Sequence, residues 1–241
     1  MLLRGVCYNK LYLVEKEAIV LRRLFIIEGI DGSGKTTQVA LLRQRLEAEG
    51  HSVLQIKLPN YGSPACAPVE QYLAGTYGSD ADSVNAYAAS SFFAVDRFAY
   101  YKTVWGSAYE QGSVILSDRY VSSNLIHQCV KLPAAQRKEY IDWLYDLEYD
   151  KMGIPRPDGV FYLDVPPQIT DGLMTSRYEG DESKKDIHER NRDYLLRCYE
   201  MGMYCCDNLG FQKIRCLNED GTMRSREEIS QEIFSKISHL L

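Results

Sequence analysis

The chain has 241 residues, of which 45% are hydrophobic and 25% charged, and its net charge at neutral pH is −5. These values are typical of one folded α/β domain and exclude a disordered, collagen-like or coiled-coil chain. The acidic balance excludes non-specific binding to nucleic acid, and no run of about 18 apolar residues indicates a membrane-spanning helix. We therefore expect neither a nucleic-acid partner nor a membrane association.

Residues 1–20 precede the first predicted core strand, and charged residues interrupt their apolar runs. They lack the continuous apolar core of a signal peptide, so we treat them as an N-terminal extension of unknown role. The seven cysteines are odd in number and form no C-x-x-C pair. This pattern favours reduced thiols over a disulfide framework or a zinc site, and we expect a cytoplasmic location.

Five short apolar runs are predicted to be buried β-strands, at residues 24–28, 53–58, 114–118, 160–164 and 211–217. Helical patterns alternate with them, at residues 35–49, 81–105, 187–208 and 226–240. Strands that alternate with helices indicate a parallel sheet covered on both faces. We expect a three-layer α/β sandwich around a five-stranded parallel sheet, with ligands bound beyond the carboxyl ends of the strands.

The segment after the first predicted strand has the pattern G-x-x-x-x-G-K-T of a phosphate-binding loop, or P-loop. It consists of Gly29, Ile30, Asp31, Gly32, Ser33, Gly34, Lys35 and Thr36. The glycines let successive backbone N–H groups point at phosphate oxygens, and the following helix presents its N-terminus to the same anion. Lys35 adds a positive charge for the β- and γ-phosphates, and the Thr36 hydroxyl is suited to bind Mg²⁺. We expect these eight residues to bind a nucleoside triphosphate.

Two adjacent charges, Asp118 and Arg119, follow the apolar run of the third predicted strand. Because this end of a parallel strand faces the ligand crevice, we expect Asp118 to hold Mg²⁺ through water and Arg119 to bind an acceptor phosphate. A solvated ion pair at a strand end is the alternative. A guanine-specific GTPase is not indicated, because the only Asn-Lys dipeptide precedes the P-loop. The combination favours a small-molecule kinase.

Phe93 and Arg97 lie four residues apart in the helix predicted at residues 81–105, so they share a helix face. A ring for stacking and a guanidinium for hydrogen bonding suit a nucleobase. Core packing by Phe93 beside a surface Arg97 is the alternative that the helix pattern alone favours.

A charged run near residues 174–192 has little apolar content, which predicts an exposed loop. We also interpret it as a lid, whose cations neutralise charge on a transferred phosphoryl group when it closes. The candidate cations are Arg177, Lys184, Lys185, Arg190 and Arg192.

Four segments in this order resemble the thymidylate kinase family, namely LFIIEGIDGSGKTTQ, LPNYGSP, SFFAVDRF and VILSDRYVSSNLIHQ. The charged segment ending in KDIHER resembles the lid of that family. The resemblance covers residues 22 to 240 and implies a single P-loop kinase domain of the nucleoside monophosphate kinase type at residues 21–241. It implies transfer of the γ-phosphoryl group of ATP to dTMP, giving dTDP, with Mg²⁺ as cofactor. It also implies a homodimer.

The same resemblance implies roles for individual residues in binding dTMP. Phe93 would stack on thymine, Arg97 would hydrogen-bond the edge of the base, and Asn124 would contact the base region. Arg119 would hold the acceptor phosphate, and Asp31 would contact the deoxyribose 3′-hydroxyl or orient the phosphate site.

The implied catalytic residues are Lys35, Arg119 and a cation of the lid. Gly32 stands where one subtype of the family has an arginine. This resembles the subtype that supplies its catalytic arginine from the lid, and Arg177 is the first candidate.

Three positions depart from the family pattern. Asn60 and Tyr61 lie where the family commonly has an arginine on the acceptor phosphate, and Lys57 is a candidate substitute. His127 replaces a tyrosine associated with excluding a 2′-hydroxyl. Another pyrimidine (deoxy)nucleotide therefore stays open as the acceptor. Two further functions also stay open, a deoxynucleoside kinase with Asp118 as its candidate base and a non-catalytic nucleotide-binding regulator.

Overall fold

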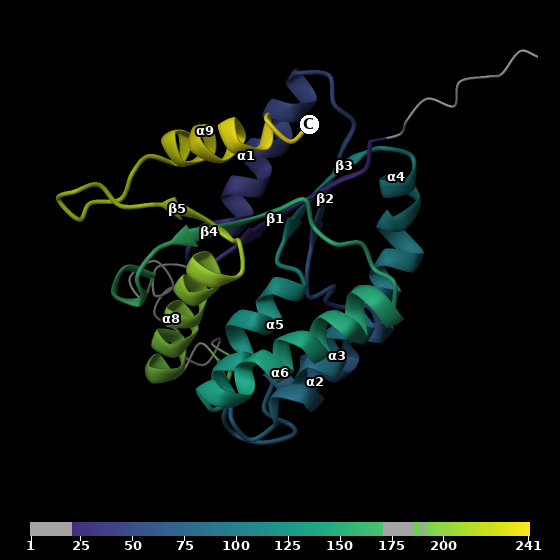
Figure 1. Cartoon of the computed structure of the whole chain (residues 1–241), viewed down its shortest axis with the longest axis vertical. Coiled ribbons are helices and arrows are strands. Elements are labelled where there is room, and N and C mark those ends of the chain that lie inside the picture. Colours follow the sequence, from purple (N-terminus) through teal and green to yellow (C-terminus); the bar gives the residue numbers. More distant parts are fainter. Residues whose placement is uncertain (1–20, 171–185, 189–190) are drawn as a thin grey trace, which may run out of the picture.

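The computed structural model of the chain describes residues 21–170, 186–188 and 191–241. One sheet lies at the centre of the molecule, with the strand order β2-β3-β1-β4-β5 and parallel pairing throughout (Figure 1). The strands are β1 (Arg23–Glu28), β2 (Val53–Lys57), β3 (Val114–Asp118), β4 (Gly159–Asp164) and β5 (Gln212–Arg215). All five predicted strands are confirmed, although β5 is shorter at both ends than predicted.

The sheet is buried on both faces, because alternate residues of its central strand belong to separate apolar clusters. Leu24 and Ile26 of β1 pack in one cluster, and Phe25 and Ile27 pack in the other. The second cluster is covered by α1 (Lys35–Ala48) and α9 (Arg226–Ile237), which lie side by side in Figure 1. The predicted three-layer sandwich is therefore confirmed.

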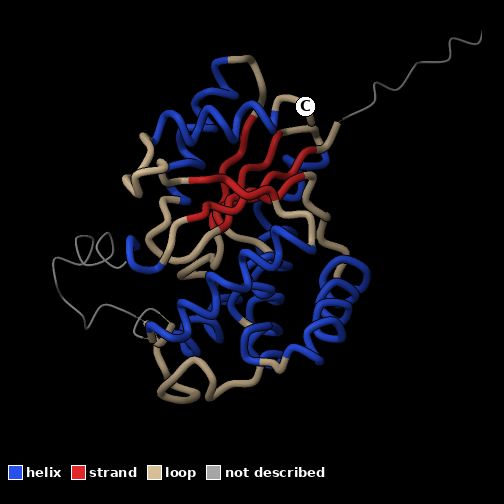
Figure 2. The backbone as a smooth tube through the Cα atoms, turned by 60° about the vertical axis from the view of Figure 1, so that its left-hand side comes forward, coloured by secondary structure: helices blue, strands red, loops and turns tan. Residues whose placement is uncertain are grey.

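The opposite side of the sheet is covered by a second group of helices (Figure 2). The apolar cluster on that side contains most of the aromatic side chains. These helices are α2 (Ala67–Leu73), α3 (Ala86–Tyr100), α4 (Gly106–Glu110), α5 (Val121–His127), α6 (Ala134–Tyr145) and α8 (Arg192–Asn208). Two 3₁₀ turns (Pro64–Cys66 and Cys129–Lys131) and two π-helical segments (Tyr101–Trp105 and Asp146–Lys151) connect or extend them.

The boundaries predicted for the helix at residues 81–105 are wrong at both ends. Asn85 caps α3, because its side-chain oxygen accepts a hydrogen bond from the Ala88 N–H at 2.9 Å. At the other end the backbone widens into the π-helical segment Tyr101–Trp105 and then continues as α4. The Trp105 ring is fully buried there. The helix is therefore interrupted where a large ring enters the core.

The helix predicted at residues 187–208 begins five residues later, at Arg192. Asn191 caps α8 by accepting a hydrogen bond from the Tyr194 N–H at 3.0 Å, which fixes that start. By contrast, α9 begins where predicted, because Ser225 and Glu228 form a reciprocal capping box.

Helices α2, α5 and α6 have no counterpart among the predicted elements. The first two have seven residues each, which is too short for an apolar period to be distinct. Charged side chains occupy much of α6, and three buried residues hold it to the core: Tyr140, Ile141 and Leu144.

Two of the predicted segments fall outside the described residues. They are the N-terminal extension at residues 1–20 and most of the lid near residues 174–192. In the part of the chain that the structure describes, no helix is both long and apolar enough to cross a membrane.

The contact between α8 and β4 depends on one glycine. A Cβ atom at Gly202 would lie 2.3 Å from the ring of Tyr162, a fully buried residue of β4. We expect Gly202→Ala to lower the free energy of unfolding, since overpacking costs about 1–3 kcal/mol and outweighs the better helix propensity of alanine, about 1 kcal/mol. Urea denaturation measures this change. In a Tyr162→Leu background the cost should shrink, and an equal cost there would contradict the packing explanation.

Candidate active site

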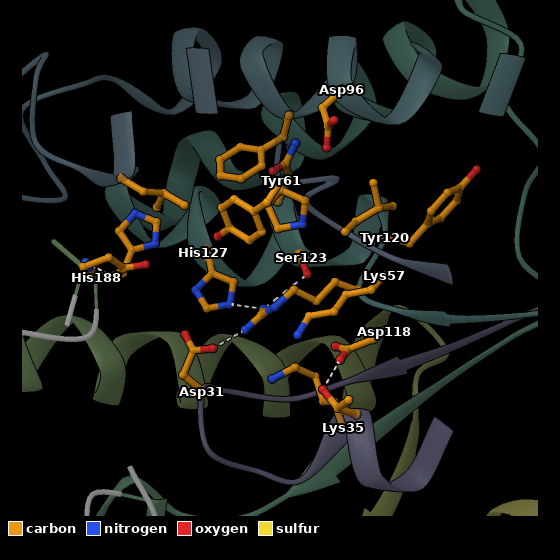
Figure 3. A pocket seen from close by; sticks show the side chains of 18 of the residues that line it. Asp31, Lys35, Lys57, Tyr61, Asp96, Asp118, Tyr120, Ser123, His127 and His188 are labelled. Atoms are coloured by element: carbon orange, nitrogen blue, oxygen red, sulfur yellow. Dashed lines mark hydrogen bonds and ion pairs between the residues drawn. The ribbon is translucent and has the colours of Figure 1, made fainter. Parts of the chain in front are cut away.

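A large cavity lies where the carboxyl ends of β1, β2 and β3 meet. Its volume is about 710 Å³, and the strand register places Asp118 opposite both Ile27 and Lys57. The P-loop and the Asp118-Arg119 pair, predicted separately from the sequence, therefore line the same cavity (Figure 3). Lys57 also lines it, from the end of β2.

The P-loop curls tightly between β1 and α1. Gly29 and Gly34 have φ angles of 151° and 92°, which side chains with a Cβ rarely adopt. A Cβ at Gly29 would also lie 2.5 Å from the Ser33 hydroxyl oxygen. The Lys35 ammonium donates to the Gly29 and Ile30 carbonyls at 3.0 and 2.9 Å. Burial and then the charge of Arg119 lower the pKa of Lys35 to about 8.

Thr36 and Asp118 form a second feature of the cavity. The Thr36 hydroxyl donates to one Asp118 carboxylate oxygen at 2.6 Å. The other oxygen, Oδ1, is buried and has no hydrogen-bond partner among the described residues. A carboxylate and a hydroxyl are hard oxygen ligands of the kind that Mg²⁺ prefers. The described residues contain no cluster of three or more His, Cys, Asp or Glu, so a metal held here needs ligands from phosphate or water.

Arg119 adopts an unusual backbone conformation at the edge of the cavity. Among the described residues it alone combines a side chain with a positive φ, 73°. Its N–H donates to the Ile27 carbonyl at 3.2 Å, and its carbonyl accepts from the Ser117 hydroxyl at 2.5 Å. These bonds hold a conformation that would otherwise be strained, and they turn the side chain into the cavity.

The Arg119 guanidinium forms an ion pair with Asp31 of the P-loop, at 2.5 Å. Burial alone would raise the pKa of Asp31, but the charges of Arg119 and Lys35 outweigh burial and hold that pKa below its ordinary value. The same guanidinium donates to His127 Nε2 at 3.0 Å (Figure 3). Charges of the two signs are therefore paired across the cavity.

Phe93 and Arg97, predicted to share a helix face, line the same cavity from α3, as does Asn124 from α5. The alternative of a surface Arg97 is wrong, because this residue is only 2% exposed. Arg97 makes two hydrogen bonds of 2.6 Å to Glu148, which is fully buried, and a third of 3.3 Å to the Tyr120 carbonyl. The guanidinium is held at the wall of the cavity by a buried ion pair.

The sequence interpretation missed Gln128 and Glu148, and it included His188 only as part of the segment that resembles the lid. Gln128 lines the cavity and is fully buried, with its side-chain amide close to the Tyr72 hydroxyl. Gln128 directly follows His127 in the sequence, and this neighbour was the signal that could have indicated a place at the site. Glu148 gave no signal, because its partner Arg97 lies 51 residues away in the sequence.

Residues 186–188 dock against α2 beside the cavity. The Ile187 N–H donates to the Leu73 carbonyl at 3.3 Å, and the Ile187 side chain is buried in the cluster around α2. His188 Nε2 lies 2.8 Å from the Tyr72 hydroxyl, and its ring stacks on that of His127 with centroids 5.9 Å apart. Residues 186–188, within the segment predicted to be a lid, are thus docked and contribute to one wall of the cavity.

Four of the five cations predicted for the lid lie outside the described residues. Arg177, Lys184, Lys185 and Arg190 fall in the undescribed segments, and Arg192 is the first residue of α8.

Burial and then the charge of Lys131 lower the pKa of His188 to about 3. Below pH about 6.5 the unfolded chain binds a proton at this residue that the folded protein does not bind, so stability falls as the pH falls from 6.5 towards 3. We expect urea denaturation to show a loss approaching about 1.4 kcal/mol per pH unit from His188. His188→Gln should reduce this pH dependence. If the free energy of unfolding falls as steeply between pH 7 and 5 in His188→Gln as in the wild type, His188 is not the source of the pH dependence.

The comparisons with known proteins agree with this geometry. The family model for thymidylate kinase matches residues 27–235. A thymidylate kinase of Mycobacterium tuberculosis is 33% identical over 176 residues, covering 72% of this chain and 81% of the relative. A probable thymidylate kinase of Pyrococcus abyssi is 30% identical over 220 residues, covering 90% of this chain and 96% of the relative.

A solved structure of thymidylate kinase from Candida albicans shares the fold. Its TM-score is 0.65 at 18% sequence identity, with 90% of this chain and 92% of that chain covered. The match of the family model to most of the chain, together with the two relatives, shows that the chain belongs to the thymidylate kinase family.

Proposed function

We propose that the protein transfers the γ-phosphoryl group of ATP to dTMP and releases dTDP. The observation that carries the proposal is that one cavity holds both a P-loop and Arg119, in a chain of the thymidylate kinase family. The P-loop suits the donor triphosphate, and a guanidinium on the facing wall suits the phosphate of the acceptor.

The donor phosphates bind to the P-loop, residues 29–36. Its backbone N–H groups and the N-terminus of α1 face the phosphates, and the Lys35 ammonium exchanges its loop carbonyls for phosphate oxygens. Exchanging two neutral acceptors for anionic oxygens favours the charged form of Lys35.

Thr36 and Asp118 would hold Mg²⁺, as their paired oxygens and the unpartnered Asp118 Oδ1 indicate. The ion, when bound, would neutralise charge on the donor phosphates. The other positive charges that face the reacting phosphates belong to side chains of this protein.

The acceptor phosphate binds to Arg119, with Lys57 as a second cation from β2. A phosphate monoester is already anionic near neutral pH, with a second pKa of roughly 6, so no general base is required. Catalysis consists of positioning the two phosphates in line and of neutralising charge, by Lys35, Arg119 and a lid cation, for which Arg177 is the proposed residue.

The nucleoside of dTMP binds on the opposite side of the cavity from the P-loop. Phe93 offers a ring for stacking, and Arg97, Asn124 and Gln128 offer polar groups for the edge of thymine. The buried amide of Gln128 combines a donor and an acceptor, which matches the N3–H and O4 of thymine. Asp31 lies beside Arg119, where it contacts the sugar hydroxyl or orients the phosphate site.

We also propose that the protein is a cytoplasmic homodimer. The six cysteines that the structure describes are free thiols, consistent with a reducing compartment. Val95 of α3 and Val104 of the π-helical segment Tyr101–Trp105 are 47% and 53% exposed. Both lie in the aromatic-rich segment at residues 87–105, which we propose as the dimer interface.

A panel of phosphoryl acceptors with Mg-ATP tests the proposed function. Nucleosides and nucleoside monophosphates are compared in a coupled ADP assay, and we expect dTMP to be the best acceptor and thymidine to be inactive. Lys35→Ala should lower the rate by about 100-fold or more, because it removes a charge that stabilises the transition state. A preference for thymidine would favour a nucleoside kinase, and ATP binding without any product would favour a regulator.

A second prediction concerns Lys57, which we propose as the substitute for the arginine that the family commonly has in the segment of Asn60 and Tyr61. Lys57→Ala should raise the KM for dTMP by about tenfold, the cost of one charge-assisted hydrogen bond, and leave the KM for ATP unchanged. Lys138→Ala, on an exposed face of α6, is the matched control and should change neither value. Equal KM values for dTMP in the Lys57 and Lys138 variants would show that Lys57 does not bind the acceptor phosphate.

A further inference from the structure

We infer that His127 is a positioning residue for Arg119, acting through a hydrogen bond that fixes the guanidinium for the acceptor phosphate. The inference rests on the proposed function, since it concerns how that phosphate meets Arg119. It assigns a purpose to a residue that departs from the pattern expected for the family.

The geometry places the two side chains in direct contact. Arg119, Ser123 and His127 follow one another at intervals of four residues, so α5 presents the latter two on one face, beneath the guanidinium. Arg119 Nη1 lies 3.0 Å from His127 Nε2 and 3.5 Å from the Ser123 hydroxyl, while Nη2 is bonded to Asp31. Figure 3 shows His127 and Asp31 bonded to the same guanidinium from α5 and from the P-loop. The guanidinium is therefore held from two elements.

The chemistry of the two groups fixes the proton positions. A guanidinium has five N–H donors and no acceptor, so His127 Nε2 accepts the bond and the ring proton lies on Nδ1. The ring is then neutral, in agreement with a side chain that is 6% exposed and faces a permanent cation. Burial and then the charge of Arg119 hold the pKa of His127 well below its ordinary value.

His127 is itself held in place, which is what a positioning residue requires. Its ring stacks on His188 with an angle of 7° between the planes. Its carbonyl accepts a hydrogen bond of 2.5 Å from the Tyr194 hydroxyl. The start of α5 is anchored to β1, where the Glu28 carboxylate accepts 2.7 Å hydrogen bonds from the hydroxyls of Ser122 and Ser123.

A fixed acceptor restricts the rotation of the Arg119 side chain before the acceptor nucleotide arrives. The Nε–H of Arg119 has no hydrogen bond to any described residue, and one Nη2–H is left over after the bond to Asp31. These donors remain for the phosphate. Because the guanidinium is already oriented, little entropy is lost when the phosphate binds.

Two variants separate this role from direct contact with the nucleoside. His127→Phe keeps a ring for the stack on His188 but removes the acceptor, and His127→Gln keeps an acceptor oxygen. Isothermal titration should show that His127→Phe weakens dTMP binding by about tenfold or more, and thymidine binding by less than about twofold. His127→Gln should recover most of the dTMP affinity. Lys138→Ala, on an exposed face of α6 and away from the cavity, is the control and should leave both affinities as in the wild type.

An Arg119→Ala background provides an independent measurement. There, His127→Phe should cause no further loss of dTMP affinity, because the group on which it acts is gone. Equal losses for thymidine and dTMP in His127→Phe, or additive losses in the double variant, would overturn the positioning role. A wild-type protein that bound thymidine as tightly as dTMP would overturn the proposed function, and this inference with it, before any variant was compared.

Discussion

The parallel pairing of β1 with β3 is the constraint on which the site depends. The register that places Ile27 beside Asp118 brings the P-loop and the Asp118-Arg119 pair to one edge of the sheet. The hydrogen bond from the Arg119 N–H to the Ile27 carbonyl extends this pairing one residue beyond the strand. These two strands end at the same level, and for this reason the two motifs line one cavity.

Electrostatic pairing explains how so many charges persist in a partly buried cavity. Removing a charge from water is costly unless a partner compensates it, and Arg119 with Asp31 and Arg97 with Glu148 provide such compensation. The Arg97 pair is almost completely buried, whereas the side chains of Arg119 and Asp31 are 14% and 22% exposed. The first pair is therefore fixed in the core at the cavity wall, whereas the second is accessible to a molecule that enters the cavity.

The sequence was sufficient for the sheet and for the P-loop, because both are encoded locally, by apolar runs and by a glycine pattern. It also predicted that Asp118 and Arg119 line the ligand crevice, since ligands of parallel α/β sheets bind beyond the carboxyl ends of the strands. It did not reveal Glu148 or the contact between His127 and His188, which join segments that only the tertiary fold brings together. The short helices were missed for a different reason, since seven residues contain too few turns for an apolar period to be recognised.

The central claim is that a triphosphate and a phosphate monoester occupy this cavity together, end to end. Titration with an analogue in which five phosphates join adenosine to thymidine tests the claim most directly. If both sites open into one cavity at the correct distance, the analogue should bind at least about 100-fold more tightly than ATP or dTMP alone, and each nucleotide should displace it. An analogue that bound no better than ATP, and left dTMP binding unaffected, would contradict the account.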